Sequence, residues 1–268
     1  MLELNKIYNM DCINGMKLLD DNSIDLTVTS PPYDNLRTYG KNVDKTWGEH
    51  IWKPVIKELY RIIKKGGVVV WIVNDATING SETGTSFKQA LYFKEVGFNL
   101  HDTMIYAKNN PIPLTHNRYE QQFEYMFVFS KGKPKTFNPI KINTKYSGSK
   151  KTGGFRQNRN GEYARNKNAP VCKSKIDYNI WWFDVGNGHS TNSIKSKHPA
   201  TYSIEIPNRH IISWSNENDI VLDPFIGSGT TAISALQNNR KYIGFEINRE
   251  YVELANEIIK TQTCSITL

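Results

Sequence analysis

Two short motifs, far apart in the chain, contain residue types suited to group-transfer chemistry. The first is Ser30-Pro31-Pro32-Tyr33, which directly follows an apolar run. The exocyclic amino group of a base is a poor nucleophile because its lone pair is delocalised into the ring. Two acceptors aimed at its hydrogens can localise that lone pair, and the Ser30 hydroxyl and the Pro31 carbonyl, stiffened by consecutive prolines, are candidates. Tyr33 could stack on such a base. Taken alone, the motif is explained at least as well by a strand-ending proline turn.

The second motif is the glycine loop, Asp223-Pro224-Phe225-Ile226-Gly227-Ser228-Gly229-Thr230-Thr231. Small residues between a strand and a helix allow a nucleoside-bearing cofactor to approach the backbone closely. Glu246 follows Gly227 by 19 residues, at the end of the next expected strand, where an acid can accept hydrogen bonds from two ribose hydroxyls. The ring of Tyr33 or Phe225 can favour a cationic sulfonium. A P-loop would need a lysine that is absent, and an NAD site would need a third glycine.

The spacing of apolar residues predicts the elements that must position these motifs. A strand over residues 24–30 ends at the prolines, and the β-branched run at 68–73 is typical of a strand buried on both faces. Further strands are expected at 101–108, 123–130, 220–223 and 242–246, the first two as antiparallel neighbours at a sheet edge. Helices are expected at 47–65, ended by Gly66-Gly67, and at 86–96, 204–215, 230–237 and 249–260. This alternation predicts an α/β fold: a mainly parallel, twisted sheet with helices on both faces.

The net charge of +8 is concentrated in one region. Residues 131–175 contain thirteen Lys or Arg and one acid, Glu162, so this segment carries +12 and the remainder of the chain −4. A solvated, partly disordered loop is one interpretation. The aromatic residues between the cations favour a nucleic-acid surface instead, because rings stack on bases while cations meet phosphates. The sequence thus predicts a basic lobe at 135–197 inserted between two halves of one sheet, 1–134 and 198–268.

Composition also narrows the class of protein. The longest apolar run, Gly66 to Val73, is far too short to cross a bilayer, and the polar N-terminal residues lack a signal-peptide pattern. Three widely spaced cysteines, Cys12, Cys172 and Cys264, favour neither a disulfide framework nor a zinc site. We therefore expect a protein of the cytoplasm, with no bound metal and no membrane partner.

With both motifs in hand, the chain resembles the β group of DNA amino-methyltransferases. In that group an (S/D/N)PP(Y/F) element precedes the target-recognition region, and the cofactor loop comes last, a permuted motif order on a Rossmann-like fold. The likeness covers nearly the whole chain except about residues 135–195. It implies S-adenosyl-L-methionine as cofactor, the glycine loop as its binding loop and Glu246 as the ribose-binding acid. It also implies that Asp11 and Cys12 lie beside the cofactor adenine, and that the segment beginning His198-Pro199 packs near its methionine end.

The target base follows from the first position of the catalytic element. In the family, Ser there is commoner among cytosine-N4 enzymes, and Asp or Asn among adenine-N6 enzymes, so Ser30 favours N4-methylcytosine and leaves adenine N6 as the alternative. Methylation at cytosine C5 would need a cysteine nucleophile, typically in a Pro-Cys pair, and none of the cysteines follows a proline.

The expected partner is double-stranded DNA with the target base flipped out of the stack. Arginine forks match guanine edges, whereas lysines more often meet phosphates. The candidate DNA-binding residues are Arg37, Arg118, Lys150, Lys151, Arg156, Arg159, Arg165 and Lys167. For residues 181–183, Trp-Trp-Phe, core or hinge packing is favoured over a base wedge.

The hypothesis is therefore a sequence-specific DNA methyltransferase of a restriction–modification system, with a possible cognate endonuclease. A DNA-binding protein that has lost catalysis, or an enzyme acting on RNA or a protein glutamine amide, are the other possibilities. Whether the protein is a monomer or a homodimer is left open.

Overall fold

The computed structural model describes residues 2–34, 47–111, 118–145, 155–165, 172–184 and 203–264. The chain divides into a larger unit, Met1–Asn138 with Asn179–Leu268, and a smaller unit, Pro139–Tyr178. The smaller unit is shorter than the expected lobe at 135–197, because residues 180–183 form a strand of the main sheet.

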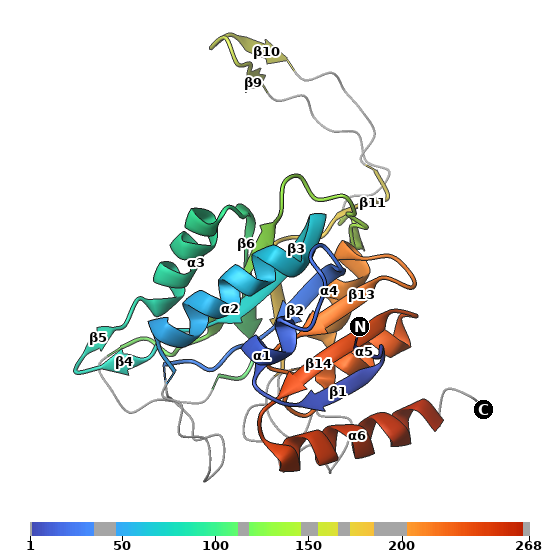
Figure 1. Ribbon diagram of the computed structural model, residues 1–268. Helices are drawn as coiled ribbons and strands as arrows, with labels where there is room; N and C mark the ends of the chain where they lie inside the picture. Colours follow the sequence, from blue (N-terminus) through green and yellow to red (C-terminus); the bar gives the residue numbers. More distant parts are fainter. Residues whose placement is uncertain are drawn as a thin grey trace. The chain divides into compact units, whose positions relative to one another are not determined.

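The larger unit is built around an eight-stranded sheet (Figure 1). In spatial order the strands are β1 (Lys6–Asn9), β14 (Lys241–Glu246), β13 (Ile220–Asp223), β2 (Ile24–Thr29), β3 (Ile63–Val73), β7 (Phe123–Ser130), β6 (Asn99–Lys108) and β12 (Ile180–Phe183). All pairings are parallel except those of β7 with β3 and β6, so β7 alone runs against the others. The mainly parallel sheet is confirmed, and β6 and β7 are antiparallel neighbours as expected. They do not form the edge, however, because β12 pairs with β6 outside them.

Helices cover both faces of this sheet (Figure 1). One group consists of α1 (Cys12–Met16), α2 (Glu49–Ile62) and α3 (Thr85–Val96), and the other of α4 (Glu205–Trp214), α5 (Thr230–Gln237) and α6 (Arg249–Cys264). Alternate residues of a central strand face opposite layers, which is why β3 reads as a continuous apolar run: it is buried from Gly66 to Val73. In the part of the chain that the structure describes, no helix combines the length and apolarity needed to span a bilayer.

The remaining strands are short. A hairpin of β4 (Thr77–Ile78) and β5 (Ser81–Glu82) follows β3 in the larger unit. The smaller unit contains two antiparallel pairs: β8 (Lys141–Asn143) with β11 (Ser174–Ile176), and β9 (Phe155–Gln157) with β10 (Tyr163–Arg165). Three-residue strands carry too little periodicity to be predicted from sequence, so none of these was expected.

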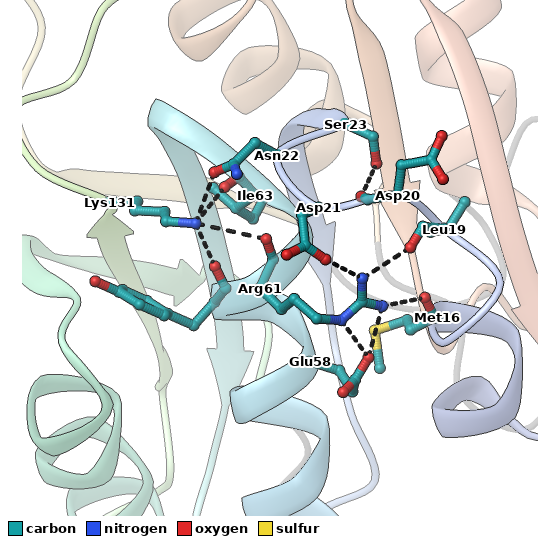
Figure 2. A network of polar contacts seen from close by, with 11 residues as sticks. Met16, Leu19, Asp20, Asp21, Asn22, Ser23, Glu58, Arg61, Ile63 and Lys131 are labelled. Atoms are coloured by element: carbon teal, nitrogen blue, oxygen red, sulfur yellow. Dashed lines mark hydrogen bonds and ion pairs between the residues drawn. The ribbon is translucent and has the colours of Figure 1, made fainter.

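The helix expected at 47–65 ends earlier, at Ile62, and Ile63 already pairs with Ile24 in the sheet. Long-range contacts stop the helix before the glycines are reached. The ammonium of Lys131, just after β7, donates to the carbonyls of Tyr60 at 2.7 Å and Ile63 at 3.0 Å (Figure 2). The backbone N–H of Gly66 donates to the Lys131 carbonyl at 2.7 Å. Sequence alone could not show that Lys131 lies at this turn.

Arg61, in the last turn of α2, joins the same region to α1 (Figure 2). Its guanidinium donates to the carbonyls of Met16 and Leu19, each at 2.8 Å, and pairs with Asp21 and Glu58. Because it satisfies carbonyls at the end of α1 and in the loop before β2, Arg61 fixes the path by which the chain enters β2.

A buried carboxylate joins β2 to β13 at the centre of the sheet. Asp223 is 2% exposed, and its two oxygens accept hydrogen bonds from the hydroxyls of Thr29, at 2.6 Å, and Thr231, at 2.7 Å. The backbone N–H of Phe225 adds a third, at 3.0 Å. The end of β2 and the start of α5 are therefore tied to one side chain, which satisfies the polar group that burial would otherwise penalise.

We expect Lys131→Met to lower the free energy of unfolding by about 2 kcal/mol, because several carbonyls at the end of α2 would lose a charged donor. Lys133→Met is the matched control, since Lys133 is exposed, and should change stability by less than about 0.5 kcal/mol. Urea denaturation measures both. Equal losses in the two variants would show that the Lys131 contacts add nothing to stability.

A second pair of variants tests the Asp223 junction within one strand. Thr29→Val should lower the free energy of unfolding by about 1–3 kcal/mol, because a buried carboxylate oxygen of Asp223 loses a hydrogen-bond donor. Thr27 is also fully buried in β2, but its hydroxyl has no hydrogen-bond partner among the described residues. Thr27→Val should therefore be neutral or stabilising. A Thr27 variant that lost as much as the Thr29 variant in urea denaturation would contradict this account of the junction.

Candidate active site

Both motifs lie at the carboxyl edge of the parallel strands. Ser30 directly follows β2, and the glycine loop follows β13, the strand beside it. From β2 the chain continues to β3 on one side, and from β13 to β14 on the other, so the two motifs flank the point where strand order reverses. Open α/β sheets bind ligands at such a switch point. The structure thus places together the two motifs that sequence analysis singled out.

The glycine loop has a backbone that other residues would adopt with strain. Gly227 has φ +50° and Gly229 has φ +84°, both in the left-handed region. At Gly229, which precedes α5, a Cβ would come within 3.2 Å of the Ala255 side chain. Asp223, Pro224, Gly227, Ser228, Gly229 and Thr230 are all buried, and Phe225 is partly buried. Burial raises the pKa of Asp223 to about 6, against the opposing effect of its three hydrogen bonds.

Glu246, at the end of β14, is directed at the glycine loop. Its carboxylate accepts a hydrogen bond from the backbone N–H of Gly227 at 3.2 Å and another from that of Asn248 at 2.7 Å. Burial raises the pKa of Glu246 to about 6, and these hydrogen bonds oppose the rise. A carboxylate has about four acceptor positions, so this group can still accept hydrogen bonds from neighbouring hydroxyls.

Asp11 and Cys12 follow β1, which pairs with β14 in a register that sets Asn9 opposite Glu246. The Asp11 carboxylate caps α1 by accepting hydrogen bonds from the N–H groups of Ile13 and Asn14, at 3.1 and 3.2 Å. Cys12 is buried beside it. Both residues therefore lie at the same sheet edge as Glu246 and the glycine loop.

The turn after β2 carries a chain of polar side chains. The Ser30 hydroxyl is 2.9 Å from the Tyr33 hydroxyl, and the Tyr33 hydroxyl donates to Glu124 at 2.8 Å. The other oxygen of Glu124 pairs with Lys108 at 2.7 Å. Pro31 is buried and Pro32 is partly buried, which holds the turn in place.

Glu124 and Lys108 were not among the site residues expected from the sequence. Glu124 comes at the start of β7, and because β7 runs against its neighbours its first residues meet the carboxyl ends of β3 and β6. A signal was available: Glu124 is the one acid in the apolar run 123–130. Trp47 was also missed; it is buried against Phe225 with ring centroids 5.5 Å apart.

Of the other expected residues, one lies in the larger unit, three lie in the smaller unit and the rest fall outside the described ranges. Arg118 donates to the carbonyl of Gly80 and lies 3.7 Å from Glu82, so in this structure it holds the β4–β5 hairpin. Arg159 is exposed in the smaller unit, between the strands β9 and β10 that contain Arg156 and Arg165. The residues outside the described ranges are Arg37, Lys150, Lys151, Lys167, His198 and Pro199.

The Trp-Trp-Phe segment forms β12. Trp181 is buried, with its ring 4.7 Å from His210 of α4, and the guanidinium of Arg209 lies 4.5 Å from the Trp181 ring. The expected core packing is confirmed for Trp181, whereas Trp182 is exposed on the edge strand.

Comparison with known proteins connects this geometry to a family. The sequence model of a family described as DNA methylase matches residues 24–257. The orphan methyltransferase M.BamHII of Bacillus amyloliquefaciens is 51% identical over 249 residues, which cover 90% of this chain and 91% of that protein. The type II methyltransferase M.BglII of Bacillus subtilis is 32% identical over 265 residues, covering 96% of this chain and 69% of that protein.

Among solved structures, the PvuII DNA methyltransferase (cytosine-N4-specific) matches with a TM-score of 0.68. It is 21% identical and covers 96% of this chain and 90% of its own, so it supports the fold. Since the family model spans most of the sequence and one relative is identical at half its positions, the chain belongs to the β-group DNA amino-methyltransferases, S-adenosylmethionine-dependent enzymes that modify adenine N6 or cytosine N4.

Proposed function

We propose that this protein is a sequence-specific DNA methyltransferase that transfers a methyl group to the exocyclic N4 of a flipped-out cytosine. The observation that carries the proposal is the placement of Ser30 beside the glycine loop, with the ends of β2 and α5 tied to Asp223. A base amino group held at Ser30 would therefore face a cofactor held by the loop.

The described residues fit S-adenosylmethionine. Gly227 leaves backbone without a Cβ at the loop, and Glu246 presents a carboxylate to ribose hydroxyls. We assign the adenine end to Asp11 and Cys12, and the loop contacts to Asp223, Pro224, Phe225, Ser228 and Thr230. His198 and Pro199 are assigned to the methionine end from the family resemblance. When bound, the cofactor supplies an electrophilic methyl group on a sulfonium.

The catalytic turn prepares the amino group. The Ser30 hydroxyl and the Pro31 carbonyl accept hydrogen bonds from the two amino hydrogens, which localises the nitrogen lone pair towards the methyl group. Tyr33 stacks on the base. A neutral serine is a weak base, so the amino group would pass its proton to water after methyl transfer, when the product nitrogen has become strongly acidic.

Ser30 supports cytosine N4 over adenine N6, because the family correlates serine at this position with N4 enzymes. The structural neighbour named as cytosine-N4-specific is consistent with this choice, but its likeness concerns the fold. Adenine N6 is the alternative, since the family includes enzymes of both kinds.

Duplex DNA is the proposed substrate, and the proposed recognition lobe is residues 135–197, which contain most of the +12 segment at 131–175. We assign guanine contacts to Arg156, Arg159 and Arg165, and phosphate contacts to Lys150, Lys151 and Lys167. Arg37 and Arg118 are assigned to the DNA strand near the flipped base. For this, Arg118 must give up its contacts with the β4–β5 hairpin and contact the DNA instead.

We place the enzyme in the cytoplasm, in a restriction–modification system or as an unpaired modification enzyme. Relatives whose names carry the words type II methyltransferase and orphan methyltransferase support these two settings. A cognate endonuclease belongs to the first setting only.

Product analysis tests the reaction and the base. Purified protein, mixed duplex DNA and S-adenosylmethionine are incubated, and the DNA is digested to nucleosides for mass spectrometry. We expect N4-methylcytosine, and Ser30→Ala should lower kcat at least tenfold, because a hydrogen bond worth about 1.5 kcal/mol is lost. N6-methyladenine would overturn the base assignment. No methylated base in DNA, with RNA and protein substrates run in parallel, would overturn the proposed activity.

The pKa of Glu246 gives a test of cofactor binding. An ionised carboxylate accepts hydrogen bonds from ribose hydroxyls, and a protonated one loses an acceptor position. With a pKa of about 6, affinity for S-adenosylhomocysteine should rise by about tenfold between pH 5 and pH 7.5 and then level off. Glu246→Gln should bind weakly throughout, without this slope. Calorimetric titration measures it, with Glu250→Gln, an exposed acid, as the control. A Glu246→Gln variant that kept the slope would exclude Glu246 as its source.

A further inference from the structure

Four polar side chains extend in a line from the catalytic turn: Ser30, Tyr33, Glu124 and Lys108. They come from three elements, the turn after β2, the start of β7 and the end of β6. The side chains of Lys108 and Glu124 are 19% and 15% exposed, so water screens their ion pair only partly. Among the described residues, the Tyr33 hydroxyl is the only hydrogen-bond partner of the Ser30 hydroxyl.

The chemistry of these groups fixes the direction of every hydrogen bond in the line. An ammonium only donates, and an ionised carboxylate only accepts. The Tyr33 hydroxyl has a single hydrogen, and it is used on Glu124. Tyr33 can therefore only accept from Ser30, so the Ser30 hydrogen points at Tyr33. The Ser30 oxygen is left with lone pairs alone for any other partner.

We propose that Glu124, held by Lys108, is a positioning residue that makes Ser30 an acceptor towards the substrate amino group. This inference rests on the proposed function. A serine hydroxyl rotates freely, and a hydrogen directed at the amino nitrogen would occupy the lone pair that must attack the methyl group. The Lys108–Glu124 ion pair prevents this orientation of the Ser30 hydroxyl: Glu124 accepts the Tyr33 hydrogen, and Tyr33 therefore accepts the Ser30 hydrogen. The family motif accepts Phe or Tyr at this position, so the arrangement is a property of chains that carry Tyr here.

Replacing Glu124 by Gln should reverse the line. Lys108 can contact only the amide oxygen, so the amide NH₂ of the new side chain faces Tyr33 and donates to it. The Tyr33 hydrogen, no longer accepted by a carboxylate, is then available to Ser30, whose own hydrogen becomes free to point at the substrate. Lys108→Met breaks the same ion pair but leaves the carboxylate as an acceptor, so it preserves the direction of the line and serves as the matched control.

The test is a double-mutant cycle on kcat for DNA methylation, with melting temperatures as a check of folding. We expect Tyr33→Phe to lower kcat about five- to tenfold and Glu124→Gln at least tenfold, both with the KM for S-adenosylmethionine within about twofold of wild type. In the Tyr33→Phe background, Glu124→Gln should change kcat by less than about twofold, because its effect passes through the missing hydroxyl. Lys108→Met should lower kcat by a smaller factor than Glu124→Gln does.

Two outcomes would overturn the inference while leaving the proposed function intact. In the first, the wild-type enzyme is active, but Glu124→Gln lowers kcat by the same factor whether Tyr or Phe is at position 33. The other is a Tyr33→Phe variant with wild-type kcat, and this second measurement decides the matter even where Glu124→Gln does not fold. A wild-type enzyme that methylates no DNA would instead remove the proposed function itself.

Discussion

The buried carboxylate of Asp223 is the contact on which the site geometry depends. Asp223 ends β13, and it holds the hydroxyl of Thr29 at the end of β2 and that of Thr231 at the start of α5. A group this deeply buried keeps its charge only when donors surround it, so the two strand ends and the helix cannot shift independently. Ser30, the proposed hydrogen-bond acceptor for the amino group, and the glycine loop are thereby held in fixed positions relative to each other before any ligand binds.

Around this contact, the parallel sheet brings together residues that are distant in sequence. The carboxyl ends of β1, β14, β13 and β2 carry Asp11, Glu246, Asp223 and Ser30. The antiparallel strand β7 adds Glu124 by presenting its first residues at the same edge. One reversed strand thus adds an acid beside Tyr33 that a wholly parallel order would have placed at the opposite end of the sheet. The proposed reaction uses both kinds of strand.

Much of this could be predicted from local patterns. Apolar spacing predicts the strands over Ile24–Thr29 and Ile220–Asp223, and the glycines predict where the helix after the loop begins. In the structure, the backbone of Gly227 and Gly229 lies in the left-handed region. The end of α2 could not be predicted, because Lys131 and the pairing of Ile63 with Ile24 stop the helix from a distance. The β12 strand was missed for a similar reason: its partner, β6, is 75 residues away along the chain, since Ile180 pairs with Ile105.

Residue types, short spacings and local backbone preferences were enough to predict the α/β class, the two motifs and their permuted order. The folded sheet was needed to show that Asp223 joins Thr29 to Thr231, and that Glu124 joins Tyr33 to Lys108. Hydrogen-bond partners are chosen by which strand ends become neighbours, and that choice is made by the packing of the whole sheet. A single acid in an apolar strand, such as Glu124, indicates that a polar partner exists. The partner is identified only when the direction of β7 in the sheet is known.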